Sequence, residues 1–209
     1  MFRTRSIFYK TVDRKTVGRK TIRGQNVKHK LRALRAARVL KQGGCVAHAT
    51  STLPGIAADP NNQQAIRQLQ RFKQRAGPFL LLADSIHTAL RQARYISPAL
   101  RRLARSSWPG AVSLIIPAKP GLHAACYEKS SMALRVDASQ QTRCLAKACG
   151  GLLLSSSLNR SKQPPCKASL GMQLRLHVFV NDRLTSETSS GKASQIMRVW
   201  RNDCTLIRA

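Results

Sequence analysis

The chain has 209 residues and carries 37 Lys or Arg against 8 Asp or Glu, so its formal net charge is +29. Such an excess of positive charge predicts salt-sensitive attraction to polyanions, RNA above all. The scarce carboxylates argue against hydrolysis by paired carboxylates and against two-metal sites built from protein ligands, and no apolar run reaches the roughly 18 residues of a membrane helix.

Residues 1–26 are predicted to form a flexible basic arm that precedes a single domain at 27–209. Eight Lys or Arg side chains stand in this arm against one carboxylate, Asp13. The composition suits a segment that contacts RNA, a transit peptide, or a solvated tail without a specific role.

The first half of the domain is predicted to alternate helices and strands. Apolar residues at helical spacing predict a helix from Val27 to Leu40, which the Gly43-Gly44 pair ends. A short strand is expected at Cys45–Ala49, before a polar loop at 50–52. A second helix is expected to open at Asp59-Pro60-Asn61, and Phe79–Ala83 has the pattern of an apolar strand.

The second half continues in the same way. Ser97 and Pro98 are a typical cap and first-turn pair for a helix that ends near Ser107. A further helix is expected at 138–149, and strands are expected at 112–116, 132–136, 152–154, 174–180, 196–200 and 204–207. This interleaving predicts an α/β fold: a single domain with a twisted mixed sheet flanked by helices.

Four polar clusters stand at the ends of predicted elements or inside a predicted strand, where ligands bind in open α/β sheets. They are the Thr50-Ser51-Thr52 loop, Lys73 with Arg75, Arg135, and Ser157 with Asn159. Together they offer the cations and neutral donors that phosphate recognition needs. Turn formation and the helix dipole are the alternative explanations for the first two clusters. A buried Arg135 needs an anionic partner, for which an anionic ligand is a candidate.

Several common sites are not supported by the sequence. Neither the P-loop pattern nor Gly-x-Gly-x-x-Gly is present, so these two modes of nucleotide binding have no motif. His48 and His87 are expected to be packed rather than catalytic. The six cysteines form no Cys-x-x-Cys pair and no zinc-finger spacing. We therefore expect no metal held by the protein itself, and a reduced, cytoplasmic protein.

Six segments, in chain order, resemble motifs of the YrdC-like family. Cys45–Pro60, CVAHATSTLPGIAADP, is similar to the family's VIAYPT(D/E)TVYGLGCDP, and Lys73 and Arg75 match its Lys-x-Arg. The other matches are WPGAVS at 108–113 to WPGP(L/V)T, SMALRV at 131–136 to S(V/L)AVRV, SSLNRSK at 156–162 to (T/S)SAN-x-SG, and KASQI at 192–196 to NPS-x-I. The resemblance spans Leu31–Ala209.

The resemblance implies a threonylcarbamoyl-AMP synthase, a nucleotidyltransferase. Such an enzyme condenses L-threonine, bicarbonate and ATP into threonylcarbamoyl-AMP and pyrophosphate, and partner proteins transfer the threonylcarbamoyl group to tRNA. By the family's pattern, threonine would contact Thr52, Arg135, Ser157 and Ser194. ATP would contact Lys73, Arg75, Ser131 and Asn159, with Mg²⁺ held mainly through the ATP phosphates. No catalytic residue is assigned. The basic surface implies tRNA or double-stranded RNA as a further partner.

The chain departs from the family's motifs at several supporting positions. Ser51 stands where the motif has an acidic residue, and Pro54 stands where it has an aromatic one. Further departures are Ala76, Lys162 and Arg198. These changes predict an activity that is reduced, altered or lost. The alternative functions are a degenerate, non-catalytic RNA-binding member of the same fold and a purely structural basic protein.

Overall fold

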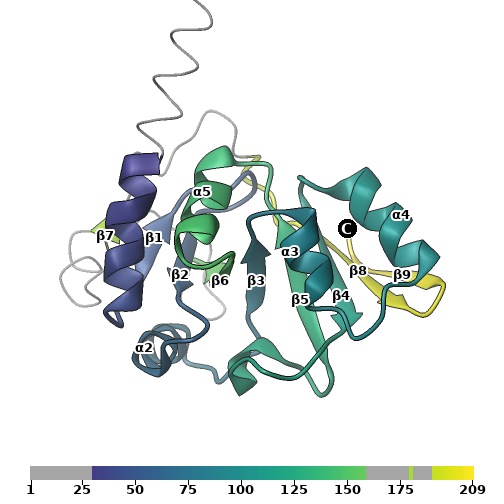
Figure 1. Ribbon diagram of the computed structural model, residues 1–209, viewed down its shortest axis with the longest axis horizontal. Helices are drawn as coiled ribbons and strands as arrows, with labels where there is room; N and C mark the ends of the chain where they lie inside the picture. The colour runs from purple at the N-terminus through teal and green to yellow at the C-terminus, as the bar shows by residue number, and fades with distance from the viewer. Residues whose placement is uncertain (1–29, 159–178, 181–189) are drawn as a thin grey trace, which may run out of the picture.

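Strands of alternating side-chain direction form the centre of the molecule in this computed structural model, which describes residues 30–158, 179–180 and 190–209 (Figure 1). Within these residues the strands pair into one nine-stranded mixed sheet in the order β7-β1-β2-β6-β3-β5-β4-β8-β9. Their bounds are β1 Val46–His48, β2 Gly55–Ala58, β3 Leu80–Ala83, β4 Val112–Pro117, β5 Ser131–Val136, β6 Leu152–Ser157, β7 Phe179–Val180, β8 Gln195–Trp200 and β9 Asp203–Arg208. The predicted fold class is confirmed.

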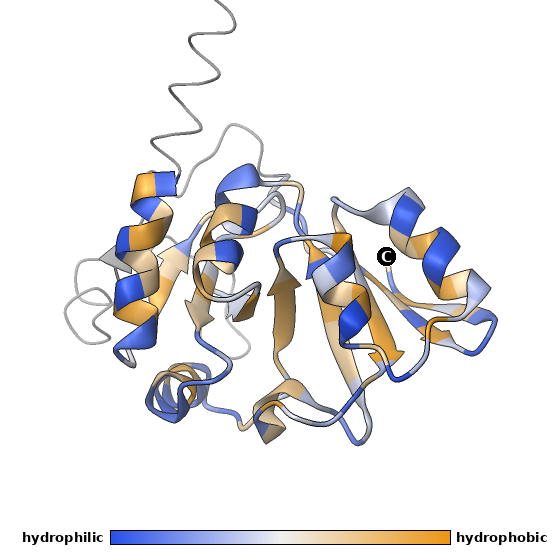
Figure 2. Cartoon of the chain, in the orientation of Figure 1, coloured by the Kyte–Doolittle hydropathy of each residue, from blue (hydrophilic) through white to orange (hydrophobic). Residues whose placement is uncertain are grey.

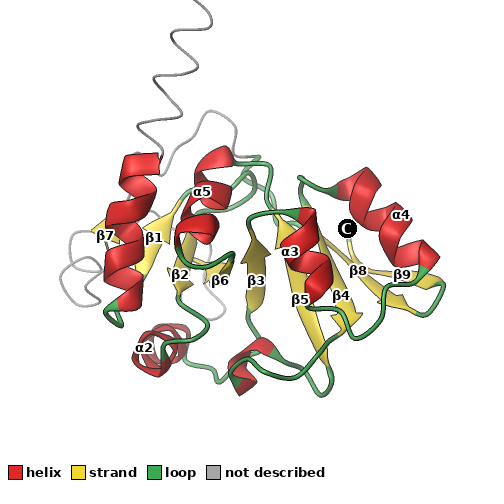
Figure 3. Cartoon of the chain, viewed as in Figure 1, coloured by secondary structure: helices red, strands yellow, loops and turns green. Residues whose placement is uncertain are grey.

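Helices flank this sheet (Figure 3). A helix that includes residues 30–41 comes first, followed by α2 Gln63–Lys73, α3 Ile86–Arg91, α4 Pro98–Ser107, the short η1 Ala124–Cys126 and α5 Gln140–Ala148. Polar side chains cap the N-termini of these helices. At α2, the Asn62 side chain accepts from the N–H groups of Gln64 and Ala65. At α4, Ser97 is the N-cap and precedes Pro98. The predicted helix start at Ser97-Pro98 is confirmed. The helix α2 begins at Gln63, after the expected start at Asp59-Pro60-Asn61.

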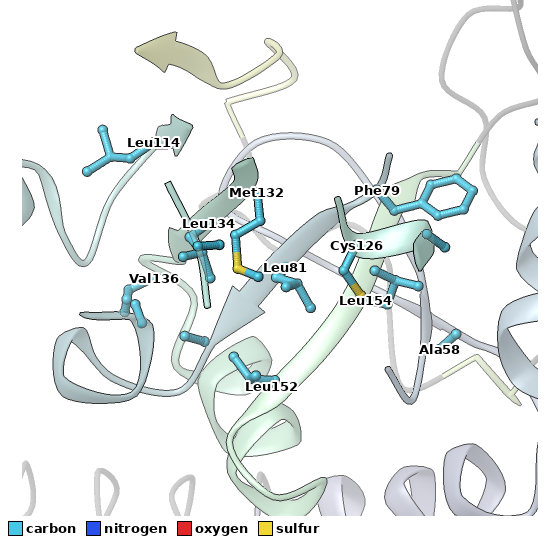
Figure 4. Close-up of a cluster of buried hydrophobic side chains, with 14 of the residues drawn as sticks. Ala58, Phe79, Leu81, Leu114, Cys126, Met132, Leu134, Val136, Leu152 and Leu154 are labelled. Carbon is cyan, nitrogen blue, oxygen red and sulfur yellow. The ribbon is translucent and has the colours of Figure 1, made fainter. Parts of the chain in front are cut away.

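One face of the sheet carries the larger part of the core. Leu81 pairs with Leu134 on one side and Leu154 on the other, and Leu134 pairs with Leu114, so these leucines form one row. The row packs against apolar residues of α2, α3 and α4, and Figure 4 shows this cluster around Leu81 and Leu134. Each fully buried leucine contributes roughly 2 kcal/mol.

The opposite face is covered along only part of its length. Leu82, Leu153, Ala57 and Val46 pack against the helix at 30–41 and against α5. Figure 2 shows these helices with hydrophobic and hydrophilic residues on different sides, and strands that are mostly hydrophobic. The rest of this face, on β4, β5 and the end of β6, lines a cavity instead.

Three expectations about individual elements need correction. The strand β2 and the helix α3 were not predicted, because four and six residues are too few to show a clear period. Ser155–Ser157 belong to β6 instead of following it. On the helix at 30–41, Ala33, Ala36, Ala37 and Leu40 are buried, while Leu31 and Leu34 are each 56% exposed. Small side chains let that helix approach the sheet.

Some predictions lie outside the described residues. These are the basic arm at 1–26, Asn159, and the expected strand at 174–180 apart from Phe179 and Val180. The strand pair at the C-terminal end is confirmed, because β8 and β9 pair as antiparallel neighbours. Among the described residues, no helix is both long and apolar enough to cross a membrane.

Candidate functional site

A cavity of about 360 Å³ occupies the part of the sheet that the helices leave open. Its floor is made of alternate residues from neighbouring strands, since every second side chain of a strand points to the same face. Two loops and the C-terminal end of β9 form its walls. The polar and charged lining residues are Thr50, Thr52, Arg75, Ser113, Glu128, Ser131, Arg135, Ser155, Ser156, Ser157, Ser194 and Arg208.

Arg135 lies on the cavity floor and is almost entirely buried, with 2% of its surface exposed. Its Nε donates to the carbonyl of Gly110 at 2.9 Å, and its Nη1 donates to the hydroxyl of Thr52 at 2.8 Å. Its Nη2 donates to the hydroxyl of Ser51 at 2.8 Å and to the carboxylate of Asp137. Burial lowers the pKa of the guanidinium, and the charge of Asp137 opposes that shift.

The partner of Arg135 corrects the sequence argument. Asp137 is 0% exposed and forms an ion pair with Arg135. A carboxylate of the chain itself therefore balances the buried guanidinium, and an anionic ligand is not needed to explain its burial. A spacing of two puts side chains on one face of a strand, but Asp137 follows the last residue of β5, where this period need not continue.

The Thr50-Ser51-Thr52 loop is attached to this pair. The Ser51 N–H donates to Asp137 at 3.0 Å, and the Thr50 hydroxyl lies 3.1 Å from that of Thr52. Thr50 also donates to the carbonyl of Leu53 at 2.7 Å. The turn-forming explanation therefore holds for Thr50, while Ser51 and Thr52 connect the loop to β5. The structure brings the predicted residues Thr52 and Arg135 into direct contact.

Lys73 and Arg75 differ in position. Lys73 is the last residue of α2, and the residue is 4% exposed. Its ammonium donates to the carbonyl of Ser157 at 3.0 Å. It lies behind the cavity wall rather than among the lining residues. Arg75 lines the cavity, donates to the carbonyl of Pro78 at 2.9 Å and stacks 4.6 Å from the centre of the Phe79 ring. Lys73 therefore contacts the polar end of β6, while Arg75 lines the same cavity as Ser157.

The serines of β6 form a second part of the floor. Ser157 pairs with Gly55 and Ser155 pairs with Ala57 on β2, so the loop before β2 and the end of β6 are adjacent. Ser157 therefore lies between Lys73 and the Thr52 side of the cavity. Asn159, predicted to act with it, lies outside the described residues.

The remaining predicted residues, Ser194 and Ser131, line the cavity from the segment before β8 and from the start of β5. Ser194 donates to or accepts from Ser113 at 3.0 Å, which connects the segment before β8 to β4. Ser131 begins β5 and exchanges backbone hydrogen bonds with Glu128. All predicted site residues that the structure describes, except Lys73, line the one cavity.

Two charged lining residues were missed by sequence reasoning. Arg208 ends β9, and its Nε and Nη2 donate to the carbonyl of Ser194 at 3.1 and 2.7 Å. The expected strand stopped one residue before it, and only the pairing of Ile196 with Arg208 places it at the cavity. Glu128 lies in a turn between β4 and β5, where the sequence shows no pattern. The lining thus carries three arginines and one carboxylate.

His48, on β1, contacts Ser155, which lines the cavity. It is 2% exposed, and its Nε2 lies 3.1 Å from the Ser155 hydroxyl. A methyl group added at Gly55 would stand 2.7 Å from this nitrogen, so the two residues are tightly packed. Burial lowers the pKa of His48 to about 4. The expectation of a packed residue is confirmed for His48 and wrong for His87, which is exposed on α3.

The neutral His48 predicts a pH-dependent stability. The unfolded chain binds a proton on this ring near pH 6.5, while the folded chain does so only near pH 4. Stability is therefore lost as the pH falls through this window, by about 2 kcal/mol from this residue at pH 5. Urea unfolding at pH 7 and pH 5 should show a smaller loss for His48→Gln than for the wild type. His87→Gln is the matched control, and equal losses in all three proteins would contradict the assignment.

The part of the chain that the structure describes shows neither a metal-binding cluster nor an activated thiol. Over 30–158, 179–180 and 190–209, no three His, Cys, Asp or Glu side chains gather in a way that could hold a metal ion. Cys45, Cys126 and Cys149 are free thiols, and burial raises the pKa of each to about 12. These thiols are inert core residues rather than nucleophiles.

The fold and the cavity define an α/β protein with a polar cavity on the open part of one sheet face. Residues 38–209 match the Sua5/YciO/YrdC family, whose description is "Telomere recombination", and the chain belongs to this family. Two similar proteins are both named threonylcarbamoyl-AMP synthase. The one from Thiobacillus denitrificans is 35% identical over 136 residues, which are 62% of this chain and 71% of the relative. The one from Stenotrophomonas maltophilia is 31% identical over 158 residues, which are 73% and 85%.

Solved structures share the fold at low sequence identity. The P. abyssi Sua5 structure complexed with L-threonine has a TM-score of 0.71 and 18% identity, and covers 86% of this chain and 54% of that one. E. coli YciO has a TM-score of 0.72 and 14% identity, and covers 86% and 89%. This chain therefore spans about half the length of the Sua5 chain and most of the length of YciO.

Proposed function

We propose that this protein is a threonylcarbamoyl-AMP synthase that condenses L-threonine, bicarbonate and ATP. The observation that carries the proposal is the cavity itself, where the 50–52 loop, β5, the end of β6 and the segment around Ser194 meet. These segments are far apart in the sequence, and each contains one of the motifs that resemble the family. The shared name of the relatives supports the same reaction and favours it over a non-catalytic RNA-binding role.

The proposed reaction is a carbamate adenylation. The threonine amine forms a bond to the bicarbonate carbon while a C–O bond breaks and water leaves, which gives a carbamate. An oxygen of this carbamate then attacks the α-phosphorus of ATP. The new bond is carbamate oxygen to phosphorus, and the bond that breaks joins the α-phosphorus to the bridging oxygen of the leaving pyrophosphate. The nucleophile is supplied by the substrate, so the protein contributes positioning and stabilisation of developing negative charge.

The cavity suits an amino acid with its carboxylate at one end and a triphosphate at the other. We assign threonine to the end with Thr52, Arg135, Ser157 and Ser194. Four of the five guanidinium N–H groups of Arg135 are engaged by the chain itself, which leaves one on Nη1 for a ligand. Its positive charge is already balanced by Asp137, so its part is to orient Thr52 and to offer one directed donor.

We assign ATP to the end with Lys73, Arg75, Ser131 and Asn159. Lys73 and Arg75 bring two cations toward Ser157, where a triphosphate would need them. Mg²⁺ would arrive with ATP, bound by phosphate oxygens and water, as this ion prefers. Glu128 is exposed and lines the cavity, so it could add one carboxylate ligand to such an ion.

The decisive experiment is a pyrophosphate-release assay with the purified full chain. Release is expected only when ATP, L-threonine and bicarbonate are all present. Leaving out threonine should reduce release to the background of protein-free buffer. A release rate that does not depend on threonine would sink the proposed function, and product identity is checked by mass spectrometry of the adenylate.

We further propose that tRNA or double-stranded RNA and the proteins of threonylcarbamoyl transfer are partners, and that the protein acts in the cytoplasm. The +29 net charge supports an RNA contact, and the free thiols suit a reducing compartment. Gel-shift titrations with tRNA at several salt concentrations should show affinity that falls steeply with salt. Affinity independent of salt would contradict an electrostatic RNA contact.

A further inference from the structure

We propose that Asp137 is a positioning residue, which holds the Arg135 guanidinium and the 50–52 loop in the orientation that receives the amino-acid substrate. This inference rests on the proposed function for the identity of that substrate. It assigns to Asp137 the negative charge beside Arg135, to which the 50–52 loop contributes only the hydroxyl and N–H of Ser51.

The carboxylate of Asp137 is fully buried and fully used. One oxygen accepts from the Ser51 N–H at 3.0 Å and from the Ser139 N–H at 2.8 Å. The other accepts from the Ser51 hydroxyl at 3.2 Å and from Arg135 Nη2. A buried carboxylate with this many donors is held in one place. Asp137 therefore joins the loop, β5 and the start of α5.

This arrangement fixes the direction of the Arg135 side chain. Asp137 and Ser51 hold Nη2 on one side, and the Gly110 carbonyl holds Nε on the other. The guanidinium is planar, so these bonds also fix the direction of Nη1, which donates to Thr52 at 2.8 Å. Without the carboxylate, Arg135 loses its counter-charge and Ser51 loses two of its bonds.

Positions 51 and 137 are equivalent places for one negative charge. The Ser51 hydroxyl lies 2.8 Å from Arg135 Nη2 and 3.2 Å from the Asp137 carboxylate. An acidic side chain at 51 would thus reach the same guanidinium from the loop side. In this chain the negative charge is carried by Asp137, directly after β5. A carboxylate placed at position 51 should therefore restore the site in a protein that lacks the charge at position 137. Two carboxylates together would repel each other across this short distance.

The test compares Asp137→Asn, Ser51→Asp and the double variant with the wild type. Asp137→Asn keeps the shape and removes the charge. We expect it to raise the KM for threonine at least tenfold, with a smaller change in kcat and in the KM for ATP. The double variant should recover a threonine KM within about threefold of the wild type, while Ser51→Asp alone should impair the enzyme. Asp203→Asn, at an exposed position on β9, is the matched control.

A second readout does not depend on activity. In NMR spectra, the Arg135 Nε–H should exchange slowly with water in the wild type, faster in Asp137→Asn, and slowly again in the double variant. If Asp137→Asn fails to fold, Ser51→Ala removes one bridging hydroxyl and should speed the same exchange while the ion pair remains.

The two readouts separate the two proposals. A wild type without threonine-dependent pyrophosphate release would defeat the proposed function, and the Arg135 exchange rates would then decide the role of Asp137 alone. An active wild type whose threonine KM and Arg135 exchange are unchanged in Asp137→Asn would overturn the positioning role. Loss in Asp137→Asn without recovery in the double variant would overturn the equivalence of positions 51 and 137.

Discussion

Replacing Arg135 with alanine is expected to lower kcat/KM for threonine at least a hundredfold. The guanidinium connects the Gly110 carbonyl, the Thr52 and Ser51 hydroxyls and the Asp137 carboxylate at the floor of the cavity. Alanine removes all of these bonds, and with them the donor that we propose for the substrate. Directed donors in a site closed to water commonly contribute a hundredfold or more to the rate. Steady-state pyrophosphate release with varied threonine measures the loss.

A stability measurement must accompany this prediction, because alanine leaves Asp137 buried without its counter-charge. Breaking a buried pair in this way costs about 3 to 5 kcal/mol. Arg135→Lys keeps a positive charge but cannot reach four acceptors at once, so it should fold better and still lose most activity. Arg102→Ala, on the exposed side of α4, controls for the loss of one arginine. If the Arg135→Lys enzyme folds and keeps the wild-type KM for threonine, the several N–H donors of the guanidinium are not needed to bind threonine.

Apolar runs were enough to predict most strands of this sheet. Phe79–Ala83, Val112–Ile116 and Met132–Val136 each match an observed strand within two residues. They succeed because both faces of these strands meet either core or cavity, so they are apolar almost throughout. The strand β2 was missed because it has only four residues and only Leu53 and Pro54 separate it from the polar loop at 50–52.

The site was predictable only as separate pieces. The polar side chains at 52, 73, 75, 135 and 157 stood out because each stands at the end of a predicted element or inside a predicted strand. Their pairing was not visible, since it depends on strand order, with β6 between β2 and β3. Arg208 is the clearest case. It follows an ordinary strand pattern, and only the pairing of β9 with β8 brings it to Ser194.

The Asp137 ion pair shows why composition can mislead about a ligand. With so few carboxylates in the chain, a buried arginine was expected to need an anion from outside. One of the eight acidic residues is nevertheless placed beside it, and both are almost completely excluded from water. Under the proposed function, Arg135 would therefore contribute the geometry of its donors more than net positive charge.

Replacing Lys73 with methionine is expected to reduce activity at least a hundredfold, with the larger effect on ATP use. The ammonium is buried at the end of α2 and anchored 3.0 Å from the carbonyl of Ser157, a residue that lines the cavity together with Arg75. Under the proposed function, a cation held there would stabilise negative charge that develops on the phosphates as pyrophosphate leaves. Methionine has a similar length and removes only the charge and its donors.

The alternative is that Lys73 serves only to cap α2, as the helix dipole favours cations in its last turn. That role contributes about 0.3 to 1 kcal/mol of stability and no catalysis. Lys147→Met, on the exposed face of α5, is the matched control and should leave activity unchanged. If Lys73→Met lowers the midpoint of urea unfolding but keeps more than a third of the wild-type kcat/KM for ATP, the capping role is sufficient and Lys73 has no part in binding the triphosphate.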